Sequence, residues 1–238
     1  MKEHNCLLLA AAGDDCFLEF RDPATVLIPG RQEPERVFAA VTDALAAGRH
    51  VAGWLGYELG HALERSGSNT SSSARDCGWL GVFGEPGRRT LESLRREYTD
   101  AAYARTPGVF VPAAARYAAA VDSSLDHIRR GDVYQVNYTG EFSFGFSGAG
   151  LALFLDLLAA HPVPHAAYLR LPDREILSLS PELFFSLEAG LITTKPMKGT
   201  APREENPAAD RAAGEGLAAC GKNRAENLMI VDLLRNDL

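Results

Sequence analysis

Residues 183–194, LFFSLEAGLITT, and the segment that follows, KPMKGTAPR (residues 195–203), decide how this chain is interpreted. Two strand-like apolar runs on either side of the turn EAG predict a β-hairpin. Lys198 comes next, between Met197 and Gly199, beside sequence that is otherwise suited to burial. A lysine at the end of a strand usually extends its ammonium group into water on an apolar stem. If Lys198 does not, its position needs a chemical reason.

The bulk composition is that of an ordinary globular protein. The 238 residues are 46% apolar and 23% charged, and 24 Lys plus Arg stand against 31 Asp plus Glu, a net charge of −7. This balance argues against a nucleic-acid-binding protein, which typically carries a basic surface. No apolar run approaches the length of a membrane span, and the four cysteines lack metal-type spacing, which indicates reduced thiols. We therefore expect a cytoplasmic protein that binds neither nucleic acid nor membrane.

The chain divides into an N-terminal stretch of short apolar runs and a second stretch that carries more information. Between them, residues 86–112 read as a charged, irregular connection, and the expected domains are residues 1–110 and 111–238. The Ser-rich residues 65–76 predict a loop. In the second stretch, apolar runs separated by PDR and EAG predict an antiparallel meander. The expected fold class is α+β, with mostly antiparallel sheets flanked by helices.

Residues 133–146, VYQVNYTGEFSFGF, alternate with a period of two. Apolar residues occupy most even positions, and Gln135, Asn137 and Thr139 share the other face, which predicts a strand. That polar face either meets water or lines the floor of a pocket. Periodicity alone favours the exposed face.

The last predicted helix, KNRAENLMIVDLLRNDL (residues 222–238), is apolar almost all round, and we expect it to be buried. Glu226 lies on the same helix face as Ile230 and Leu233. A carboxylate in such surroundings must be paired, protonated or bound to a metal.

Three charged side chains thus stand in or beside apolar sequence: Glu182, Lys198 and Glu226. Each has an ordinary structural explanation, because Glu182 could begin a strand in solvent and Lys198 could extend into water. Glu226 could pair with Lys222 or Arg224. Charged groups in apolar surroundings are also the groups that active sites use, and the residues alone leave both explanations open.

Four motifs, in this order, resemble the chorismate-utilising enzymes, and within them the aminodeoxychorismate synthase component I group: GDVYQVNYT, LSLSPELFF, KPMKGTAPR and KNRAENLMIVDLLRNDL. The segments FLEFRDP and AGWLGYELGHALE are similar to the N-terminal part of that family, so the resemblance covers nearly the whole chain. It implies an anthranilate-synthase-component-I-like fold. The family continues well beyond LLRNDL, so the C-terminal part of that fold is missing here.

The resemblance implies that chorismate is aminated at C4 with ammonia to give 4-amino-4-deoxychorismate, in para-aminobenzoate and folate biosynthesis. In this group, a lysine at the position of Lys198 attacks C2 of chorismate as the C4 hydroxyl leaves, whereas anthranilate and isochorismate synthases typically have alanine there. The attacking lysine must be neutral, and moving its pKa from about 10.4 towards 7 costs roughly 4–5 kcal/mol. Desolvation and a neighbouring Mg²⁺ would supply this.

The resemblance also implies roles for Glu182 and Glu226. Glu182 matches the general acid that protonates the departing hydroxyl, because hydroxide is a poor leaving group. Glu226 matches a ligand of Mg²⁺, which holds the ring carboxylate of the substrate.

The substrate-binding positions implied by the resemblance are Gln135, Asn137, Gly199 and Thr200. Gln135 stands where the water-using relatives carry a lysine base, and a glutamine cannot deprotonate water, which suits ammonia as the nucleophile. Gly199 and Thr200 would bring backbone and hydroxyl donors to a substrate carboxylate.

The resemblance further implies a glutamine amidotransferase, separate or fused, that supplies ammonia, since no activated cysteine with a histidine is visible here. The second metal-ligating glutamate of the family is not present, so we expect the isolated chain to be inactive. Two alternatives stay open. One is anthranilate synthase component I, against which Lys198 argues. The other is a non-catalytic fragment that needs a separate C-terminal half.

Overall fold

The computed structural model describes residues 5–11, 16–63 and 77–238. They form two compact units. The first unit contains the described residues up to Leu91 together with Leu158–Leu238, and the second contains Glu92–Leu157. The Ser-rich residues 65–76 lie outside the described residues.

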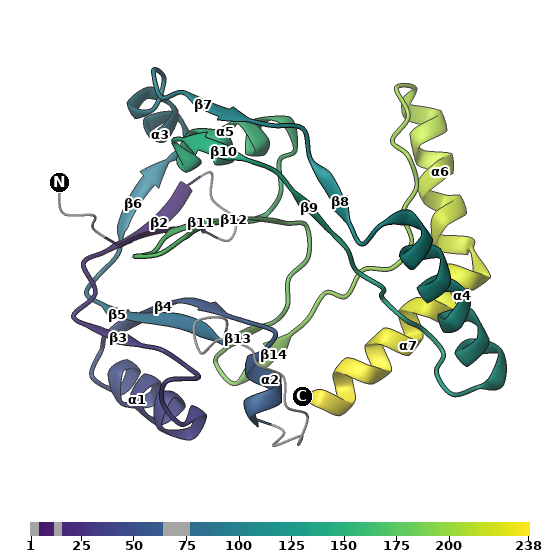
Figure 1. Ribbon diagram of the computed structural model, residues 1–238, viewed down its shortest axis with the longest axis horizontal. Helices are drawn as coiled ribbons and strands as arrows, with labels where there is room; N and C mark the ends of the chain where they lie inside the picture. The colour runs from purple at the N-terminus through teal and green to yellow at the C-terminus, as the bar shows by residue number, and fades with distance from the viewer. Residues whose placement is uncertain (1–4, 12–15, 64–76) are drawn as a thin grey trace. The chain divides into compact units, whose positions relative to one another are not determined.

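Two antiparallel sheets build the first unit. Their strands are β1 (Cys6–Ala10), β2 (Cys16–Arg21), β3 (Thr25–Leu27), β4 (His50–Leu55), β5 (Gly78–Phe83), β6 (Gly87–Thr90), β11 (His165–Arg170) and β12 (Glu175–Ser180). One sheet has the order β12-β11-β1-β2-β6, and the other has the order β3-β5-β4. Figure 1 shows the two sheets facing each other, with α1 (Pro34–Ala46) along the three-stranded sheet. A short helix, α2 (Leu59–Leu63), follows β4.

The interior between these sheets is apolar because the pleat points alternate side chains inward. Phe20 of β2 and Phe83 of β5 are both buried, and their ring centroids lie 5.4 Å apart. The other buried members of this core are Leu7, Ala52, Trp79, Leu169 and Leu171. A second core of Leu27, Val37 and Val82 joins α1 to the three-stranded sheet. The first of these cores holds β11 and β12, the strands that lead to the candidate site, through Leu169 and Ile176.

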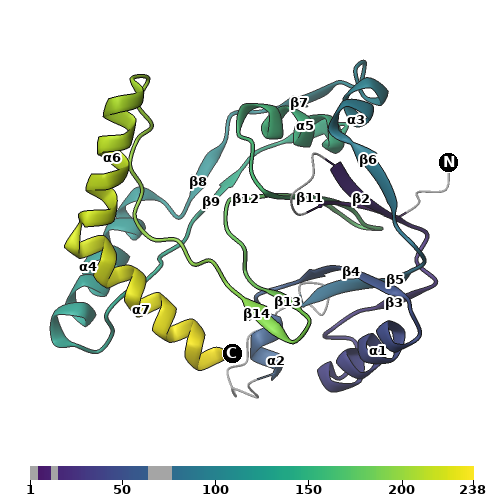
Figure 2. The ribbon, with the colours of Figure 1, turned by 180° about the vertical axis from the view of Figure 1, so that it is seen from behind.

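Beyond β12 the first unit continues into a separate hairpin and two helices. β13 (Ser186–Glu188) and β14 (Leu191–Thr193) pair with each other alone among the described strands. α6 (Pro207–Ala219) begins after Asn206, whose side chain accepts hydrogen bonds from first-turn backbone N–H groups, a normal N-cap. α7 (Gly221–Asp237) follows directly and contacts α6 (Figure 2).

The second unit contains short strands and most of three helices: α3 (Leu91–Glu97), β7 (Tyr103–Arg105), β8 (Val109–Val111), α4 (Ala114–Arg130), β9 (Glu141–Ser143), β10 (Phe146–Gly148) and α5 (Gly150–Ala160). β7 pairs with β10, and β8 pairs with β9. α4 ends at Gly131, whose φ of +78° is the left-handed conformation that glycine adopts at helix ends. Among the described helices, none has both the length and the apolar character needed to cross a bilayer.

The α+β class and the antiparallel sheets are confirmed. So is the hairpin predicted in residues 183–194, which is β13 and β14. The predicted single meander is wrong, because β11–β12 and β13–β14 are hairpins in two different sheets. Residues 86–112 are also less irregular than expected, since β6, α3, β7 and β8 lie there. Their strands are only three or four residues long, too short for a clear alternation.

The strand predicted for residues 133–146 is largely absent, since only β9 and the first residue of β10 fall within it. No described strand pairs with residues 133–140. In that stretch the apolar Tyr134, Val136 and Tyr138 are exposed, and Gln135 is the one residue that is half-buried. Alternation predicts a strand only where a neighbouring strand and an apolar layer are available, and here the chain supplies neither.

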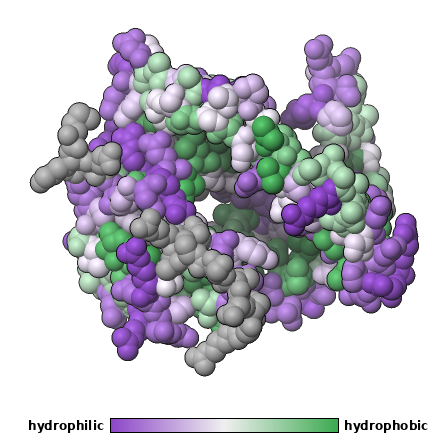
Figure 3. Space-filling view, in the orientation of Figure 1, coloured by the Kyte–Doolittle hydropathy of each residue, from purple (hydrophilic) through white to green (hydrophobic). Residues whose placement is uncertain are grey.

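The expectation that the C-terminal helix is buried is wrong for this chain. No residue of α7 is buried, and Leu228 is 68% exposed. Apolar side chains also reach the surface elsewhere on the face drawn in Figure 3. A helix that is apolar all round normally lies inside a protein, so the described residues do not provide the cover that α7 requires.

Glu19 of β2 gives the first unit a stability that depends on pH. Its side chain is 14% exposed and accepts hydrogen bonds from Arg21 at 2.8 Å and Arg89 at 3.2 Å. The Arg21 hydrogen bond is the main cause that lowers the Glu19 pKa below its ordinary value of 4.5, while burial opposes it. Because the folded pKa is depressed, this stabilisation is present above about pH 4.5 and is lost as the pH falls through the folded pKa.

We therefore expect Glu19→Gln to lower the free energy of unfolding by about 1–2 kcal/mol at neutral pH. The difference from the parent chain should shrink towards zero in acid. Urea unfolding of both proteins at neutral and at acidic pH measures it. Glu92→Gln, which removes an exposed pair with Arg96, is the control and should change stability by less than about 0.5 kcal/mol. A Glu19→Gln difference that stays constant across pH would contradict the assignment.

Candidate functional site

Glu182 lies just beyond β12, at the point where the chain leaves the five-stranded sheet. The Ser180 hydroxyl accepts a hydrogen bond from the Glu182 backbone N–H at 3.2 Å and donates one to the Glu182 carbonyl at 3.0 Å, which fixes this turn. The Glu182 side chain is exposed, and its Oε1 accepts a hydrogen bond from the backbone N–H of Met197 at 3.0 Å. The carboxylate is thereby held one residue from Lys198.

Lys198 is half-buried and lies in the irregular segment between β14 and α6. It lines a hollow of about 390 Å³ whose other walls are Pro196, Met197, Gly214, Leu217, Ala218, Asn223, Arg224 and Asn227. None of these residues is acidic, and among the described residues Lys198 forms no ion pair. The lysine predicted to react therefore stands beside another cation, Arg224, and two carboxamides, with no carboxylate lining the same hollow.

Gly199 and Thr200 continue the segment along α7. Gly199 has a φ of +76°, and a Cβ atom added to it would lie 2.7 Å from Cγ of Asn223. Only glycine fits this position, because an L side chain would be strained by the left-handed backbone and would collide with Asn223. Thr200 is exposed.

Glu226 lies on α7 but does not line the hollow that contains Lys198. Its side chain is 32% exposed, and its ion-pair partner is Lys222, with 3.8 Å between Nζ and Oε1. Among the described residues, no group of three or more His, Cys, Asp or Glu side chains is arranged to hold a metal ion. Mg²⁺ often takes only one or two carboxylates and keeps several waters. Glu226 therefore fits as one ligand of a Mg²⁺ site, and the described residues do not complete that site.

Gln135 and Asn137 belong to the second unit. The Gln135 Nε2 donates to Oδ1 of Asn137 at 3.5 Å. The Gln135 Oε1 is buried and has no hydrogen-bond partner among the described residues. A buried acceptor without a partner costs about 1–3 kcal/mol, so this oxygen is ready to accept a hydrogen bond from a ligand. That property depends on burial, which the alternating sequence pattern did not reveal.

Sequence analysis did not place Asn223, Arg224 or Asn227 in the candidate site, although they line the hollow with Lys198. One signal was available. Asn223 and Asn227 are four residues apart in a predicted helix, which places two carboxamides on one face. Nothing in the sequence indicated that this face would meet the segment of Lys198.

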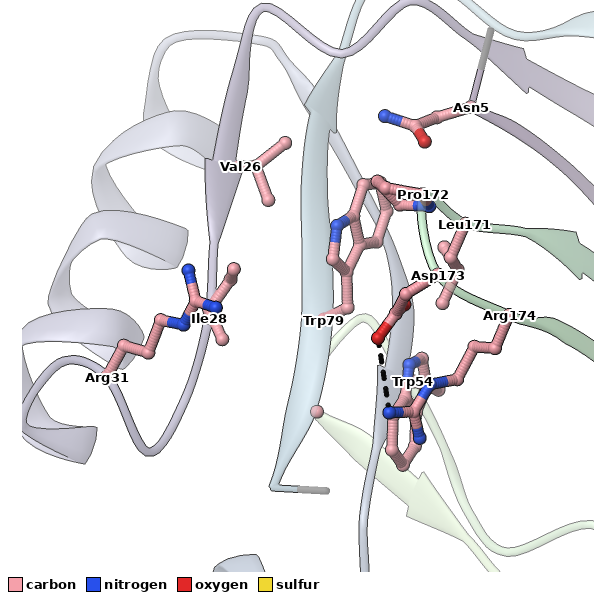
Figure 4. A pocket seen from close by; sticks show the side chains of 11 residues that line it. Asn5, Val26, Ile28, Arg31, Trp54, Trp79, Leu171, Pro172, Asp173 and Arg174 are labelled. Carbon is pink, nitrogen blue, oxygen red and sulfur yellow. Dashed lines mark hydrogen bonds and ion pairs between the residues drawn. The ribbon is translucent and has the colours of Figure 1, made fainter. Parts of the chain in front are cut away.

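A second cavity, of about 260 Å³, opens beside the sheets of the first unit (Figure 4). The indole rings of Trp54 and Trp79 contribute to its apolar wall. The guanidinium of Arg174 lies 5.8 Å from the centroid of a Trp54 ring and pairs with Asp173 at 3.3 Å. None of the predicted site residues lines this cavity.

The family model for chorismate binding enzymes matches residues 109–238, more than half of the chain. The chain therefore belongs to the chorismate binding enzyme family. It is 50% identical over 111 residues to aminodeoxychorismate synthase component 1 of Salmonella typhimurium, an alignment that covers 47% of this chain and 24% of that protein. The corresponding protein of Escherichia coli is 46% identical over 113 residues, 48% of this chain and 25% of the relative.

Anthranilate synthase component 1 of Saccharolobus solfataricus is 35% identical over 122 residues, which are 51% of this chain and 29% of that protein. The chain thus spans about a quarter of the length of these curated relatives in the aligned part. A solved structure described as a 2,3-dihydroxybenzoate-specific isochorismate synthase from Bacillus anthracis matches 98% of this chain and 59% of its own, with a TM-score of 0.65 and 21% identity. That likeness shows the fold.

Glu182→Ala should release the backbone of Met197, because it removes the carboxylate to which that N–H donates. We expect amide hydrogen exchange at Met197 to accelerate about two- to tenfold, the range that one ordinary hydrogen bond provides. Glu182→Gln keeps an acceptor oxygen and should retain most of the protection. Glu188→Ala, an exposed carboxylate in β13, is the matched control and should leave Met197 unchanged. Equal exchange in the parent and in Glu182→Ala would contradict the contact.

Proposed function

We propose that this chain carries the acid and amine of a site that aminates chorismate at C4 with ammonia, giving 4-amino-4-deoxychorismate. The observation that carries the proposal is the hydrogen bond from Met197 to Glu182, which holds a carboxyl group beside the segment of Lys198. Similarity to aminodeoxychorismate synthase component 1 at 46–50% identity supports the choice of reaction. The amination and the covalent step are the proposed part.

In the proposed reaction the neutral amine of Lys198 attacks C2 of chorismate. The ring double bond shifts, the C4–O bond breaks, and Glu182 gives its proton to the departing hydroxyl, which leaves as water. Ammonia then forms a bond to C4, the double bond shifts back, and the C2–N bond to Lys198 breaks. The ammonium group formed at C4 loses one proton, which returns Glu182 to its acid form. The amine returns as a leaving group, so each turnover consumes ammonia and releases water.

Among the residues that line the hollow with Lys198, no carboxylate offers the amine an ion-pair partner, and the one other charged side chain is Arg224. Gly199 and Thr200 would direct donors at a substrate carboxylate, and Gln135 and Asn137 are the further substrate-binding amides that the family resemblance implies. Glu226 would hold Mg²⁺, which when bound supplies positive charge for a substrate carboxylate.

Ammonia would come from a glutamine amidotransferase subunit or domain, and we place both proteins in the cytoplasm. The name "component 1" of the relatives, which implies a further component, motivates this partner.

A second candidate is a fragment that has no activity until a further polypeptide completes it. The observation that favours it is α7, which is apolar and has no buried residue. Under this alternative the 238 residues neither turn over chorismate nor bind it tightly with Mg²⁺ until the remaining part is added. Turnover by the chain alone would exclude it.

The test of the function uses the chain together with a polypeptide that supplies the unmatched part of the fold. With chorismate, Mg²⁺ and ammonium, we expect 4-amino-4-deoxychorismate by chromatography and mass spectrometry. Lys198→Ala should reduce its formation to background, and Glu182→Gln should reduce it about 10²–10⁴-fold, the usual contribution of a general acid. Lys195→Ala, on the same segment, is the matched control and should retain activity.

Quenching the reaction early should also show a Lys198 peptide whose mass has increased by chorismate minus water. Unchanged product formation by Lys198→Ala would show the covalent mechanism to be wrong. Anthranilate as the product would instead assign the chain to the anthranilate synthases, which are also among its relatives.

A further inference from the structure

The segment that carries Lys198 lies between β14 and α6 and has no helix or strand of its own. Among the described residues, no backbone–backbone hydrogen bond involves residues 195–205. The polar attachments of this segment therefore come from side chains. On the N-terminal side of Lys198, the carboxylate of Glu182 provides one by accepting from the backbone N–H of Met197.

On the C-terminal side, the attachment is Asp210, in the first turn of α6. Its carboxylate accepts two hydrogen bonds from the Arg203 guanidinium, Nε to Oδ1 and Nη2 to Oδ2, each at 2.8 Å. The backbone N–H of Glu204 donates to the same Oδ1 at 3.1 Å. A fork-shaped pair of this kind fixes orientation as well as distance, and an acidic group in the first turn of a helix is itself favourable. We call these three hydrogen bonds the Asp210 clamp.

The Asp210 clamp joins the segment to one wall of the hollow that contains Lys198. Gly214 of α6 lines that hollow and lies one helical turn after Asp210. The side chain of Asp210 is 24% exposed and that of Arg203 is 89% exposed. Because an exposed ion pair adds little to overall stability, we expect the effect of the clamp to be local: it holds the segment against α6.

We propose that Asp210 is a positioning residue for Lys198: the Asp210 clamp fixes one end of the segment whose other end is held by Glu182. A lysine on a segment that is tethered at both ends keeps its amine within a narrower range of positions than one tethered at a single end. A misplacement of about 1 Å at a reacting group can cost about 100-fold in rate. The inference rests on Lys198 being the reacting amine of the proposed function, but the clamp itself is measurable without chorismate.

Limited trypsin digestion of the full chain tests whether the clamp holds the segment, because cleavage after Lys198 requires the segment to leave its place. Asp210→Ala removes the acceptor of all three hydrogen bonds and leaves every trypsin site intact. We expect cleavage after Lys198 to accelerate about threefold or more, within the range that ordinary hydrogen bonds provide. Cleavage after Arg130, in the second unit, is the internal control and should keep its rate. Where local opening is fast, these rates follow the population of the open segment.

Two further variants serve as rescue and control. Asp210→Glu keeps a carboxylate that can reach the same donors, and it should restore most of the protection. Glu215→Ala removes an exposed carboxylate from the same helix and should leave cleavage after Lys198 unchanged. Equal acceleration after Lys198 and Arg130 would indicate a general loss of stability, and that result, or no acceleration after Lys198, would overturn the proposal.

The product assay separates positioning from a merely structural role. Asp210→Ala should lower kcat about tenfold or more and change KM for chorismate less than about twofold, since Asp210 does not line the hollow. Arg203→Ala should also lower kcat, and the double variant should be no slower than Asp210→Ala, because both changes remove the same interaction. A rise in KM with kcat unchanged, or losses that add in the double variant, would overturn the positioning role.

The two assays fail independently of each other. If cleavage after Lys198 responds as expected but the parent forms no 4-amino-4-deoxychorismate, the proposed function is wrong and the Asp210 clamp stands. If the parent forms the product and Asp210→Ala matches it in both assays, the proposed function stands and this inference is wrong.

Discussion

The apolar interior between the two sheets of the first unit is the constraint on which the candidate site depends. β12 is an edge strand that pairs with β11 alone, and Ile176 packs its inner face against the shared core. Glu182 lies two residues after the end of this strand, so the sheet fixes the position of its backbone. The backbone N–H of Met197 donates a hydrogen bond to this carboxylate. That bond holds the segment around Met197, which has no regular secondary structure.

Local sequence patterns predicted the elements that depend on local interactions. The hairpin of residues 183–194 was readable because a short turn acts within a few residues. The order of strands in each sheet was not readable, since the placement of β11 beside β1 joins residues far apart in sequence. For the same reason residues 133–140 alternate like a strand and still form none.

In the candidate site too, local features could be predicted from the sequence, whereas contacts between residues distant in sequence could not. Lys198 and Glu182 were visible in the sequence as charged groups beside apolar runs, and the family resemblance assigned them roles. That a side-chain oxygen of Glu182 meets the Met197 amide depends on how the hairpin β13–β14 returns the chain, which no pattern records. The proximity of Asn223 to Gly199 could not be predicted either, because it joins residues that are distant in sequence. For Glu226 the sequence motif was clear, but the residue does not line the hollow that contains Lys198.

The hairpin β13–β14 has a consequence for the behaviour of this chain in the cell. Both of its strands have a free edge among the described residues, and Leu187 and Leu191 are exposed. Free edges with apolar side chains pair with whichever strand reaches them, including one from another molecule. Among the described residues, this hairpin is therefore a place where the chain can associate with itself or with another protein through backbone hydrogen bonds.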